Sequence, residues 1–181
     1  MLLPLDIATL TADKRQGAVL STCGLFRYRL WRRWQDGPTI TFIMLNPSTA
    51  DATVDDATIR KCIGFAKRLG YSAIEVVNLF AFRATQPKDI KAAGWPVGEE
   101  NDRHILEAAT AANMVICAWG VNARGLQRPL DVLELLQKIG KTPKALRFTA
   151  DGIPWHPLML PYACEPADMP FVDKLLELEA A

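Results

Sequence analysis

The stretch Thr39-Ile40-Thr41-Phe42-Ile43-Met44-Leu45, followed by Asn46-Pro47-Ser48-Thr49-Ala50-Asp51, decides the predicted fold. Its first part is a largely apolar run, typical of a strand that is buried on both faces. Pro47 cannot donate a hydrogen bond to a strand ladder, so the chain must leave the sheet there. A helical pattern over residues 55–69 follows, and strand–loop–helix is the repeating unit of parallel α/β sheets.

The same alternation continues along the chain. Apolar runs predict strands at residues 73–79, 114–119 and 144–148. Amphipathic patterns predict helices at 55–69, 98–112 and 122–139, with a short helical turn at 87–93. The fold expected from this order is an α/β protein, a three-layer α/β/α sandwich around a mostly parallel four-stranded central sheet.

The segment before this alternation predicts an antiparallel addition to the sheet. Residues 26–34 form a further strand pattern, and Asp36-Gly37 lies between it and the strand at 39–45. Asp-Gly between two such runs is a strong hairpin signal, so an N-terminal antiparallel edge strand is expected. The 181 residues suggest one domain, 1–181, with a lead-in at 1–25, a core at 26–161 and a C-terminal helix within 162–181.

Composition narrows the possible partners. The net charge of +1 is too balanced for binding nucleic acid through overall charge, although a local basic patch remains open. No apolar run reaches the ~20 residues of a membrane span, and the N-terminus lacks a basic signal region. We therefore expect a cytoplasmic protein with no membrane partner. The sequence makes no prediction of the oligomeric state.

Cysteine and histidine usage argues against a metal site. The four cysteines are isolated from one another, without a Cys-x-x-Cys pair, and the chain has two histidines. We expect neither a metal nor an organic cofactor. Of the histidines, His104 lies among charged residues of a predicted helix and is expected at the surface.

Polar residues follow each predicted parallel strand, where ligands of open α/β sheets bind. Asn46 follows the first strand and His156 follows the last, in a loop that Pro154, Pro157 and Pro161 stiffen. Histidine can donate a hydrogen bond to developing negative charge. The further residues predicted to bind a substrate are Pro47, Ser48, Thr49, Asn78, Phe80, Arg83, Trp119 and Pro157.

Several of these positions have a purely structural alternative. Asn46 suits a tight turn as well as a ligand contact. Phe80 suits either stacking on a planar ligand or capping the core. Asp55 and Asp56 are expected to complement the dipole of the helix that they precede. Asp51 is then the nearest candidate for a catalytic carboxylate.

A second candidate region is the strand pattern at residues 26–34. With a period of two, Arg27, Arg29, Trp31 and Arg33 share one face of the strand. Arginines interleaved with an aromatic ring could track a phosphate backbone and stack on a base. The alternative is a charged edge strand that protects the sheet from aggregation.

Several segments in the same order resemble a known family. They are residues 44–51, 55–60, 77–85, 118–120 and 152–160. Together they resemble the uncharacterised bacterial family catalogued as domain of unknown function 1643, over about residues 27–161. That family has no established activity.

A more distant resemblance is to the uracil-DNA glycosylase superfamily, whose fold is a small α/β/α sandwich. Met44-Leu45-Asn46-Pro47-Ser48 is similar to its first motif, which reads Gly-(Ile/Met)-Asn-Pro-Gly in two branches. His156-Pro157 is similar to the start of its second motif. The resemblance implies that Asn46 positions water, that His156 stabilises a departing base and that Asn78 reads the base edge, with Phe80 as a stacking residue.

The departures from these motifs bear on the substrate. Leu45 and Ser48 replace small residues of the first motif, and Leu158 to Leu160 replace residues with which glycosylases grip and wedge the duplex. The expected function is binding of a nucleobase, nucleoside or nucleic acid, with possible hydrolysis of an N-glycosidic bond. The alternatives are a non-catalytic nucleic-acid or nucleotide-binding module, or an enzyme acting on another phosphate-bearing small molecule.

Overall fold

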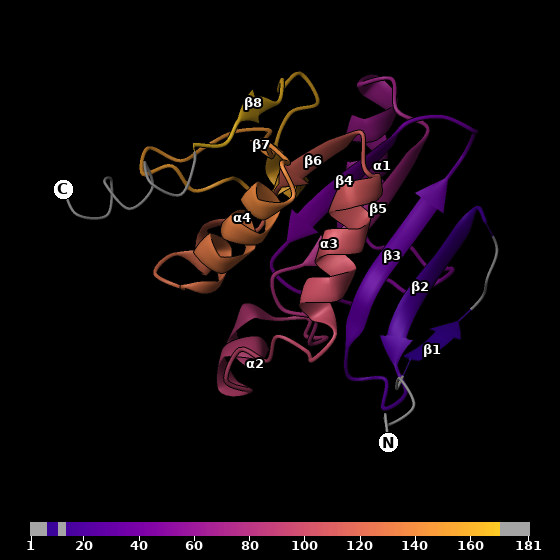
Figure 1. Cartoon of the computed structure of the whole chain (residues 1–181), viewed down its shortest axis with the longest axis vertical. Coiled ribbons are helices and arrows are strands. Elements are labelled where there is room, and N and C mark those ends of the chain that lie inside the picture. The colour runs from indigo at the N-terminus through magenta and orange to yellow at the C-terminus, as the bar shows by residue number, and fades with distance from the viewer. Residues whose placement is uncertain (1–6, 11–13, 171–181) are drawn as a thin grey trace.

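The computed structural model describes residues 7–10 and 14–170, which form one mixed sheet with helices on both of its faces (Figure 1). The strands are β1 (Ile7–Leu10), β2 (Gln16–Ser21), β3 (Arg27–Arg33), β4 (Thr39–Met44), β5 (Ala73–Asn78), β6 (Met114–Cys117), β7 (Lys144–Ala145) and β8 (Ala167–Asp168). The helices are α1 (Ala57–Arg68), α2 (Pro87–Ala92), α3 (Asn101–Ala111) and α4 (Arg128–Lys138), with 3₁₀ turns η1 (Val121–Ala123) and η2 (Pro157–Met159). The predicted mixed α/β class is confirmed.

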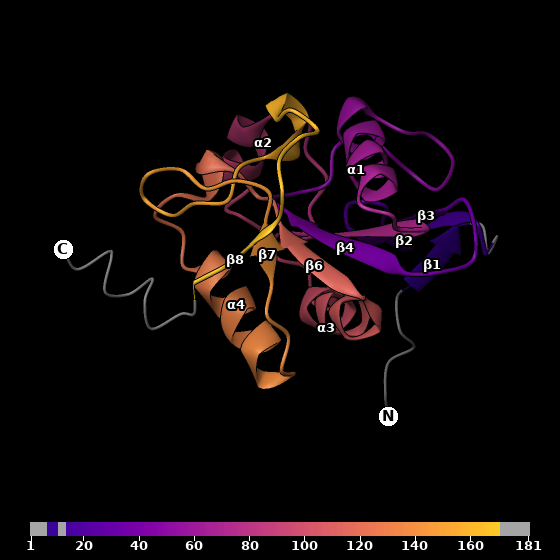
Figure 2. The same cartoon turned by 90° about the horizontal axis from the view of Figure 1, so that it is seen from above.

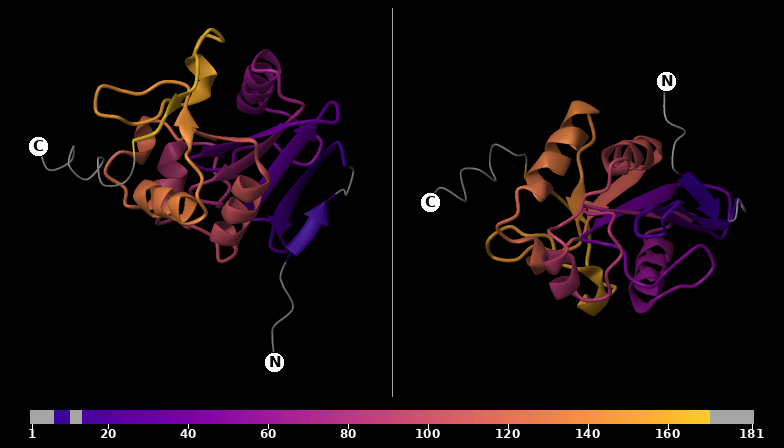
Figure 3. Two further views of the ribbon diagram at one scale, coloured as in Figure 1. Left: turned by 45° about the horizontal axis from the view of Figure 1, so that its top comes forward. Right: turned by 90° about the horizontal axis from the view of Figure 1, so that it is seen from below.

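The sheet has the strand order β1-β2-β3-β5-β4-β6-β7-β8. Strand β4 pairs in parallel with β5 and β6, and β6 pairs in parallel with β7. Antiparallel strands flank this centre, with β3, β2 and β1 beyond β5 and with β8 beyond β7. Figure 3 shows the two groups at opposite ends of the sheet, the N-terminal strands in indigo and β8 in yellow.

Helices cover both faces of the parallel centre, α1 on one face and α3 with α4 on the other (Figure 2). Side chains of β4 alternate between the two layers. Ile40 and Phe42 pack in the cluster that includes Phe65 of α1, while Ile43 packs in the cluster that includes Ile105 of α3. A strand with two buried faces needs apolar side chains at successive positions, which accounts for the run that decides the fold.

The predicted hairpin between residues 26–34 and 39–45 is wrong, because β5 lies between β3 and β4. The connecting loop instead straddles the start of β5. Ser72 accepts a hydrogen bond from the amide of Trp34 and donates one to the carbonyl of Pro38. The Asp36-Gly37 turn therefore connects β3 to β4 across the start of β5, a strand that comes later in the sequence.

The ends of the chain also differ from expectation. Residues 1–25, predicted as a lead-in, include β1 and β2, and β2 pairs along β3. Within residues 162–170 the chain forms β8, which was not predicted, and the C-terminal helix, which the sequence pattern places at 171–179, lies outside the described residues. The helix predicted from residue 122 begins at Arg128, with Pro129 in its first turn, where proline is tolerated.

One further correction concerns His104, which is buried rather than at the surface, with its ring stacked on Tyr28. The charged residues beside it in sequence face outward from α3. In the part of the chain that the structure describes, no helix has the length and apolarity to cross a membrane.

Candidate functional site

The topology of the parallel strands places one cavity at their carboxyl ends. In chain order these strands are β4, β5, β6 and β7, whereas their spatial order is β5-β4-β6-β7. The connection after β4 leads to α1 on one face, and the connection after β6 leads to α4 on the other (Figure 2). Such a switch point between adjacent parallel strands is where open α/β sheets bind ligands.

A cavity of about 270 Å³ lies at this switch point, and loops from four parallel strands contribute to it. Six residues predicted from the sequence line it. They are Arg27, Asn46, Ser48, Asn78, Trp119 and His156. The structure therefore brings together side chains that are up to 129 positions apart, from Arg27 to His156, since 156 − 27 = 129. Further polar residues line it that the sequence did not single out as ligand contacts, including Asp56, Thr58, Thr85 and Asn122.

The side-chain amide of Asn46 is fixed by the loop that it starts. Its Nδ2 donates to the carbonyl of Pro47 at 3.0 Å and to the carbonyl of Ala84 at 2.8 Å. One hydrogen atom of the amide nitrogen thus bonds within the loop after β4, and the other joins this loop to the loop after β5. The Oδ1 atom remains as a hydrogen-bond acceptor for the cavity. Asn46 consequently has a structural role in the loop and also lines the cavity.

Two buried donors in the cavity have no protein acceptor among the described residues, Nδ2 of Asn78 and Nε of Arg27. Asn78 is 1% exposed and Arg27 is 3% exposed. Another nitrogen of Arg27, Nη1, donates to the carbonyl of Ala50 at 2.6 Å. Buried donors are nearly always paired in proteins, and each unpaired one costs free energy. Both donors belong to residues that line the cavity.

The charge of Arg27 persists at neutral pH. Burial lowers the pKa of its guanidinium to about 10, and the nearby carboxylate of Asp56 opposes that shift. A protonated guanidinium in a cavity of this size attracts an anionic group or a carbonyl oxygen.

His156 presents a neutral imidazole. Its Nδ1 accepts a hydrogen bond from the amide of Leu158 at 3.3 Å, which assigns the proton to Nε2. Burial lowers the pKa of His156, and Asp56 again partly offsets the shift. At neutral pH the ring is therefore a neutral donor through Nε2.

Gly120 fixes the position of His156. The amide of Gly120 donates to the carbonyl of Pro154 at 3.0 Å, which joins the loops after β6 and β7. Gly120 has φ of +78°, and a Cβ atom there would lie 3.1 Å from Cβ of His156. Glycine thus permits both the left-handed backbone and the close approach of the histidine loop.

Asp56 is the carboxylate that lines the cavity, and Asp51 is not. Asp56 caps α1 as predicted, since its Oδ1 accepts from the amide of Ile59 at 2.8 Å, but it also faces the ligand space. Asp51 instead accepts hydrogen bonds from the amides of Thr53 and Val54, and these bonds lower its pKa. The sequence signal that could have identified Asp56 as a cavity residue is its position as a helix cap directly after a strand and its loop.

The other predicted substrate contacts lie outside this cavity. Phe80 is in the core, 3% exposed, with its ring centroid 5.1 Å from that of Trp95. Thr49 and Arg83 line an adjoining cavity of about 480 Å³, which also includes Ser48. Pro47 contributes its carbonyl to the loop, where it accepts from the amide of Ala84. Pro157 is buried at the start of η2.

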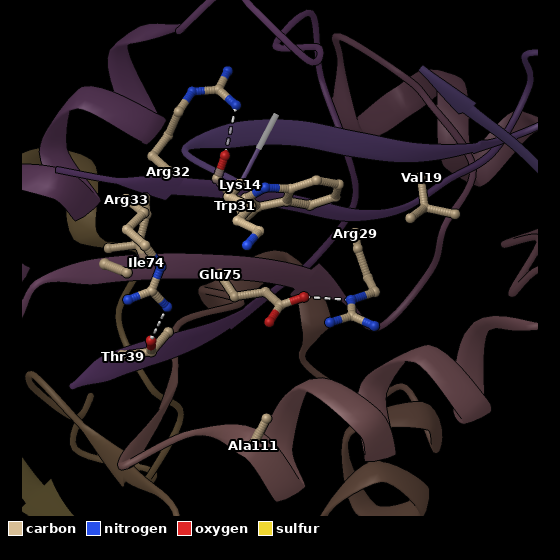
Figure 4. Close-up of a pocket in the computed structure, with 11 residues that line it drawn as sticks. Lys14, Val19, Arg29, Trp31, Arg32, Arg33, Thr39, Ile74, Glu75 and Ala111 are labelled. Carbon is tan, nitrogen blue, oxygen red and sulfur yellow. Dashed lines mark hydrogen bonds and ion pairs between the residues drawn. The ribbon is translucent and has the colours of Figure 1, made fainter. Parts of the chain in front are cut away.

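The arginines predicted to share one face of the strand at residues 26–34 lie at two different cavities. Val19 pairs with Arg29 and Leu20 pairs with Arg27, so Tyr28 is an extra residue in β3. Such a bulge reverses the alternation of side chains. Arg27 turns toward the cavity at the switch point, whereas Arg29, Trp31 and Arg33 line a separate cavity of about 390 Å³ (Figure 4). The prediction that all four residues share one face is wrong.

The titratable side chains of the described residues form no metal-binding cluster. Within residues 7–10 and 14–170, no group of three or more His, Cys, Asp or Glu side chains is arranged to hold a metal ion. The polar groups that line the candidate site include amides, an imidazole, a carboxylate and a guanidinium.

Comparison with known proteins identifies the family. The family profile described as "Protein of unknown function (DUF1643)" matches residues 27–158, which include every residue of the cavity named above. The chain therefore belongs to the DUF1643 family. No curated protein and no solved structure matches the chain.

Proposed function

We propose that the cavity at the switch point binds a nucleobase, as part of a nucleoside or nucleic acid, and that the protein hydrolyses the N-glycosidic bond. The observation that carries the proposal is the convergence on one cavity of about 270 Å³ of Asn46 and His156, from the loops after β4 and β7, and of Asn78, the last residue of β5. The resemblance of the Asn-Pro and His-Pro segments to uracil-DNA glycosylases supports it. We also propose that the parallel strands and the two layers of helices form the α/β/α sandwich of that superfamily.

The proposed reaction assigns one role to each polar group. Oδ1 of Asn46 accepts a hydrogen bond from the attacking water, because its Nδ2 is already engaged by two carbonyls. The water oxygen bonds to the anomeric carbon, and the electron pair of the breaking C–N bond passes to the base. Asp56 accepts the proton of the water, and Nε2 of His156 donates a hydrogen bond to the base anion. The leaving base finally takes up the proton.

The proposed binding mode uses the two unpaired donors. Nδ2 of Asn78 and Nε of Arg27 need acceptors, and the carbonyl oxygens and ring nitrogens of a base provide them. The rival proposal of a phosphate at the N-terminus of α1 is disfavoured by charge. Helix N-termini bind anions, but here the carboxylate of Asp56 occupies that position.

The test is a base-release assay with the full chain. Wild-type protein, Asn46→Ala and His156→Ala are incubated with single-stranded, paired and mismatched oligonucleotides that carry uracil, hypoxanthine, xanthine or alkylated bases, and with the corresponding nucleosides. Alkali cleavage reports abasic sites, and chromatography reports free base.

Release by the wild type that both substitutions reduce at least ~100-fold is the expected result. Asn122→Ala serves as a control within the same cavity, since no catalytic role is assigned to it. No release from any substrate by folded wild-type protein would overturn the hydrolytic part of the proposal. Equilibrium binding of the free bases would then decide whether the cavity is a non-catalytic recognition site.

A further inference from the structure

We propose that the cavity lined by Arg29, Trp31 and Arg33 is a second binding site, which takes a nucleotide unit with its base against Trp31 and its phosphate beside Arg33 and Lys14. The cavity has a volume of about 390 Å³, within the range of small-molecule sites. Figure 4 shows its walls, with Trp31 and the arginines from β3, Glu75 from β5 and Ala111 from α3.

The indole of Trp31 is held in place by its cross-strand partner. Trp31 pairs with Gly17 of β2. A Cβ atom on Gly17 would lie 2.1 Å from Cζ2 of the indole, so the six-membered ring lies directly against the glycine backbone. Because Gly17 has no side chain, the indole lies across β2 instead of standing away from the sheet. The ring also lines the cavity, where it offers an ordered aromatic surface for stacking.

The cationic side chains around the indole differ in how their charges are compensated. Arg29 forms ion pairs with Glu75 and with Glu107, the latter at 3.1 Å. Arg32 points away from the cavity in Figure 4, and its Nε pairs with Asp55 at 2.8 Å. Neither arginine therefore contributes an uncompensated charge to the cavity.

Arg33 and Lys14 provide that uncompensated charge. Nη1 of Arg33 donates to the carbonyl of Gly37 at 3.2 Å, and Nη2 donates to Oγ1 of Thr39 at 3.0 Å. Both acceptors are neutral, so the guanidinium is oriented while its charge stays unbalanced. Lys14 and Arg33 form no ion pair with a carboxylate in the described ranges 7–10 and 14–170. Two positive charges that line the same cavity as an indole suit a phosphate that carries an aromatic base.

The main structural alternative for this strand does not apply. Charged residues on an edge strand protect a sheet from aggregation, but β3 is flanked by β2 and β5. Its backbone is therefore already paired on both sides, and the cationic side chains need another explanation. A nucleotide unit accounts for the indole and for the two unbalanced charges together.

This site is independent of the proposed glycosidic activity. The start of β5, at Ala73, Ile74 and Glu75, lines the second cavity, whereas Val76 and Asn78 line the cavity at the switch point. A nucleotide unit at the second site could come from a free nucleotide or from a nucleic-acid strand, and both present the same phosphate and base.

The experiment measures binding of four probes to the full chain, which are thymidine, its 5′-monophosphate, inorganic phosphate and a fluorescein-labelled oligothymidylate of about ten nucleotides. Trp31→Leu, Arg33→Gln and Lys14→Gln are compared with wild type. Arg124→Gln is the matched control, because it also removes one arginine charge but lies in an exposed ion pair with Asp151. Circular dichroism verifies that each variant is folded.

We expect the phosphorylated probes to bind, with each of the three variants weakening them ~5-fold or more and Arg124→Gln leaving them unchanged. Binding of the oligothymidylate should fall as salt increases. Tighter binding of the strand than of the monophosphate would assign the site to nucleic acid, and equal binding would assign it to free nucleotides. Absence of binding, equal binding of thymidine and its monophosphate, equal binding of inorganic phosphate and the monophosphate, or unchanged binding in folded variants would overturn the proposal.

Discussion

Asp56 is the residue at which a structural role and a proposed chemical role coincide. Its carboxylate caps α1 through the amide of Ile59, and the same side chain lines the cavity with His156 and Arg27. The cap holds the carboxylate in one orientation. A catalytic base benefits from such fixation, because no conformational freedom has to be lost when the substrate binds.

Asp56→Asn separates the two roles. Asparagine caps helices about as well as aspartate, so the free energy of unfolding should change by less than about 0.5 kcal/mol. Base release should fall about 100-fold or more, because the acceptor of the water proton is lost. Asp51→Asn is the control, since Asp51 accepts its hydrogen bonds outside the cavity and should leave base release unchanged. Equal loss in both variants would remove Asp56 from the proposed reaction.

His104 illustrates how burial links one residue to the pH dependence of stability. Its side chain is 5% exposed, and Nη2 of Arg103 lies 3.3 Å from its Nε2. Burial, with added repulsion from Arg103 and Arg29, lowers the pKa of His104 to about 4 from the ordinary value of 6.5. The folded protein therefore keeps this ring neutral at pH values where the unfolded chain protonates it.

The sign of the effect follows from proton uptake. Below pH 6.5 the unfolded state binds a proton that the folded state binds only near pH 4, so the free energy of unfolding decreases as the pH falls through this window. At pH 5 the loss from His104 should be about 2 kcal/mol relative to pH 7. Urea unfolding at both pH values should show a smaller loss for His104→Gln than for wild type. Equal losses would mean that the imidazole is not held neutral.

At the scale of elements, the site depends on contacts between loops. The loop after β4 is joined to the loop after β5 by Nδ2 of Asn46, and the loop after β6 is joined to the loop after β7 by the amide of Gly120. The cavity lies among these joined loops, so its shape depends on two hydrogen-bonded connections rather than on any single loop.

Gly120→Ala tests the second connection. Alanine at φ of +78° should cost about 1–2 kcal/mol, and its Cβ atom should also displace the histidine loop. Gly140→Ala is the matched control, because Gly140 has φ of +69° but nothing within 4 Å of an added Cβ. Both variants should lose stability in urea unfolding, whereas only Gly120→Ala should lose base release. A similar loss of base release in both variants would show that Gly120 does not position His156.

The success of sequence-based prediction differed between elements for physical reasons. Strands β4, β5 and β6 are buried on both faces, so their apolar runs identify them directly. The order in which strands pair in the sheet leaves no such local signal in the sequence. The Asp36-Gly37 turn predicted pairing between β3 and β4, but β5 pairs with both. Strand β7 lies inside the strand predicted at 144–148 but includes two of those residues, and β8, which is also two residues long, is too short for any alternation to be recognised.

The candidate site was predictable to the extent that it depends on strand ends. Asn46, Asn78 and Trp119 follow or end recognisable strands, and the rule for parallel sheets then brings them together. Arg27 was predicted with the wrong neighbours, because the bulge at Tyr28 depends on pairing with β2. Asp56 was assigned to capping alone, because a sequence does not show that a cap also faces a cavity.

For the whole molecule, the candidate site is a cost to stability. A domain of this kind is stable by only about 5–15 kcal/mol, and buried donors without partners reduce that margin. Asn78 and Arg27 each place one such donor beside the cavity. The exchange of stability for function is expected where a site is organised before its ligand arrives.

Asn78→Leu tests whether the unpaired donor of Asn78 reduces the stability of the protein. Leucine has the branching of asparagine, the adjoining cavity gives it room, and it removes the unpaired donor, so the free energy of unfolding should rise by about 1 kcal/mol. For a chain of this length that change should raise the Tm by about 2–4 °C, while binding of free bases is lost. Asn101→Leu is the control, since Nδ2 of Asn101 donates to the carbonyls of Asn78 and Leu79 and its loss should lower the Tm. If Asn78→Leu lowered the Tm as well, Asn78 would be a structural residue of the core rather than an unpaired donor, because removing an unpaired buried donor should not reduce stability.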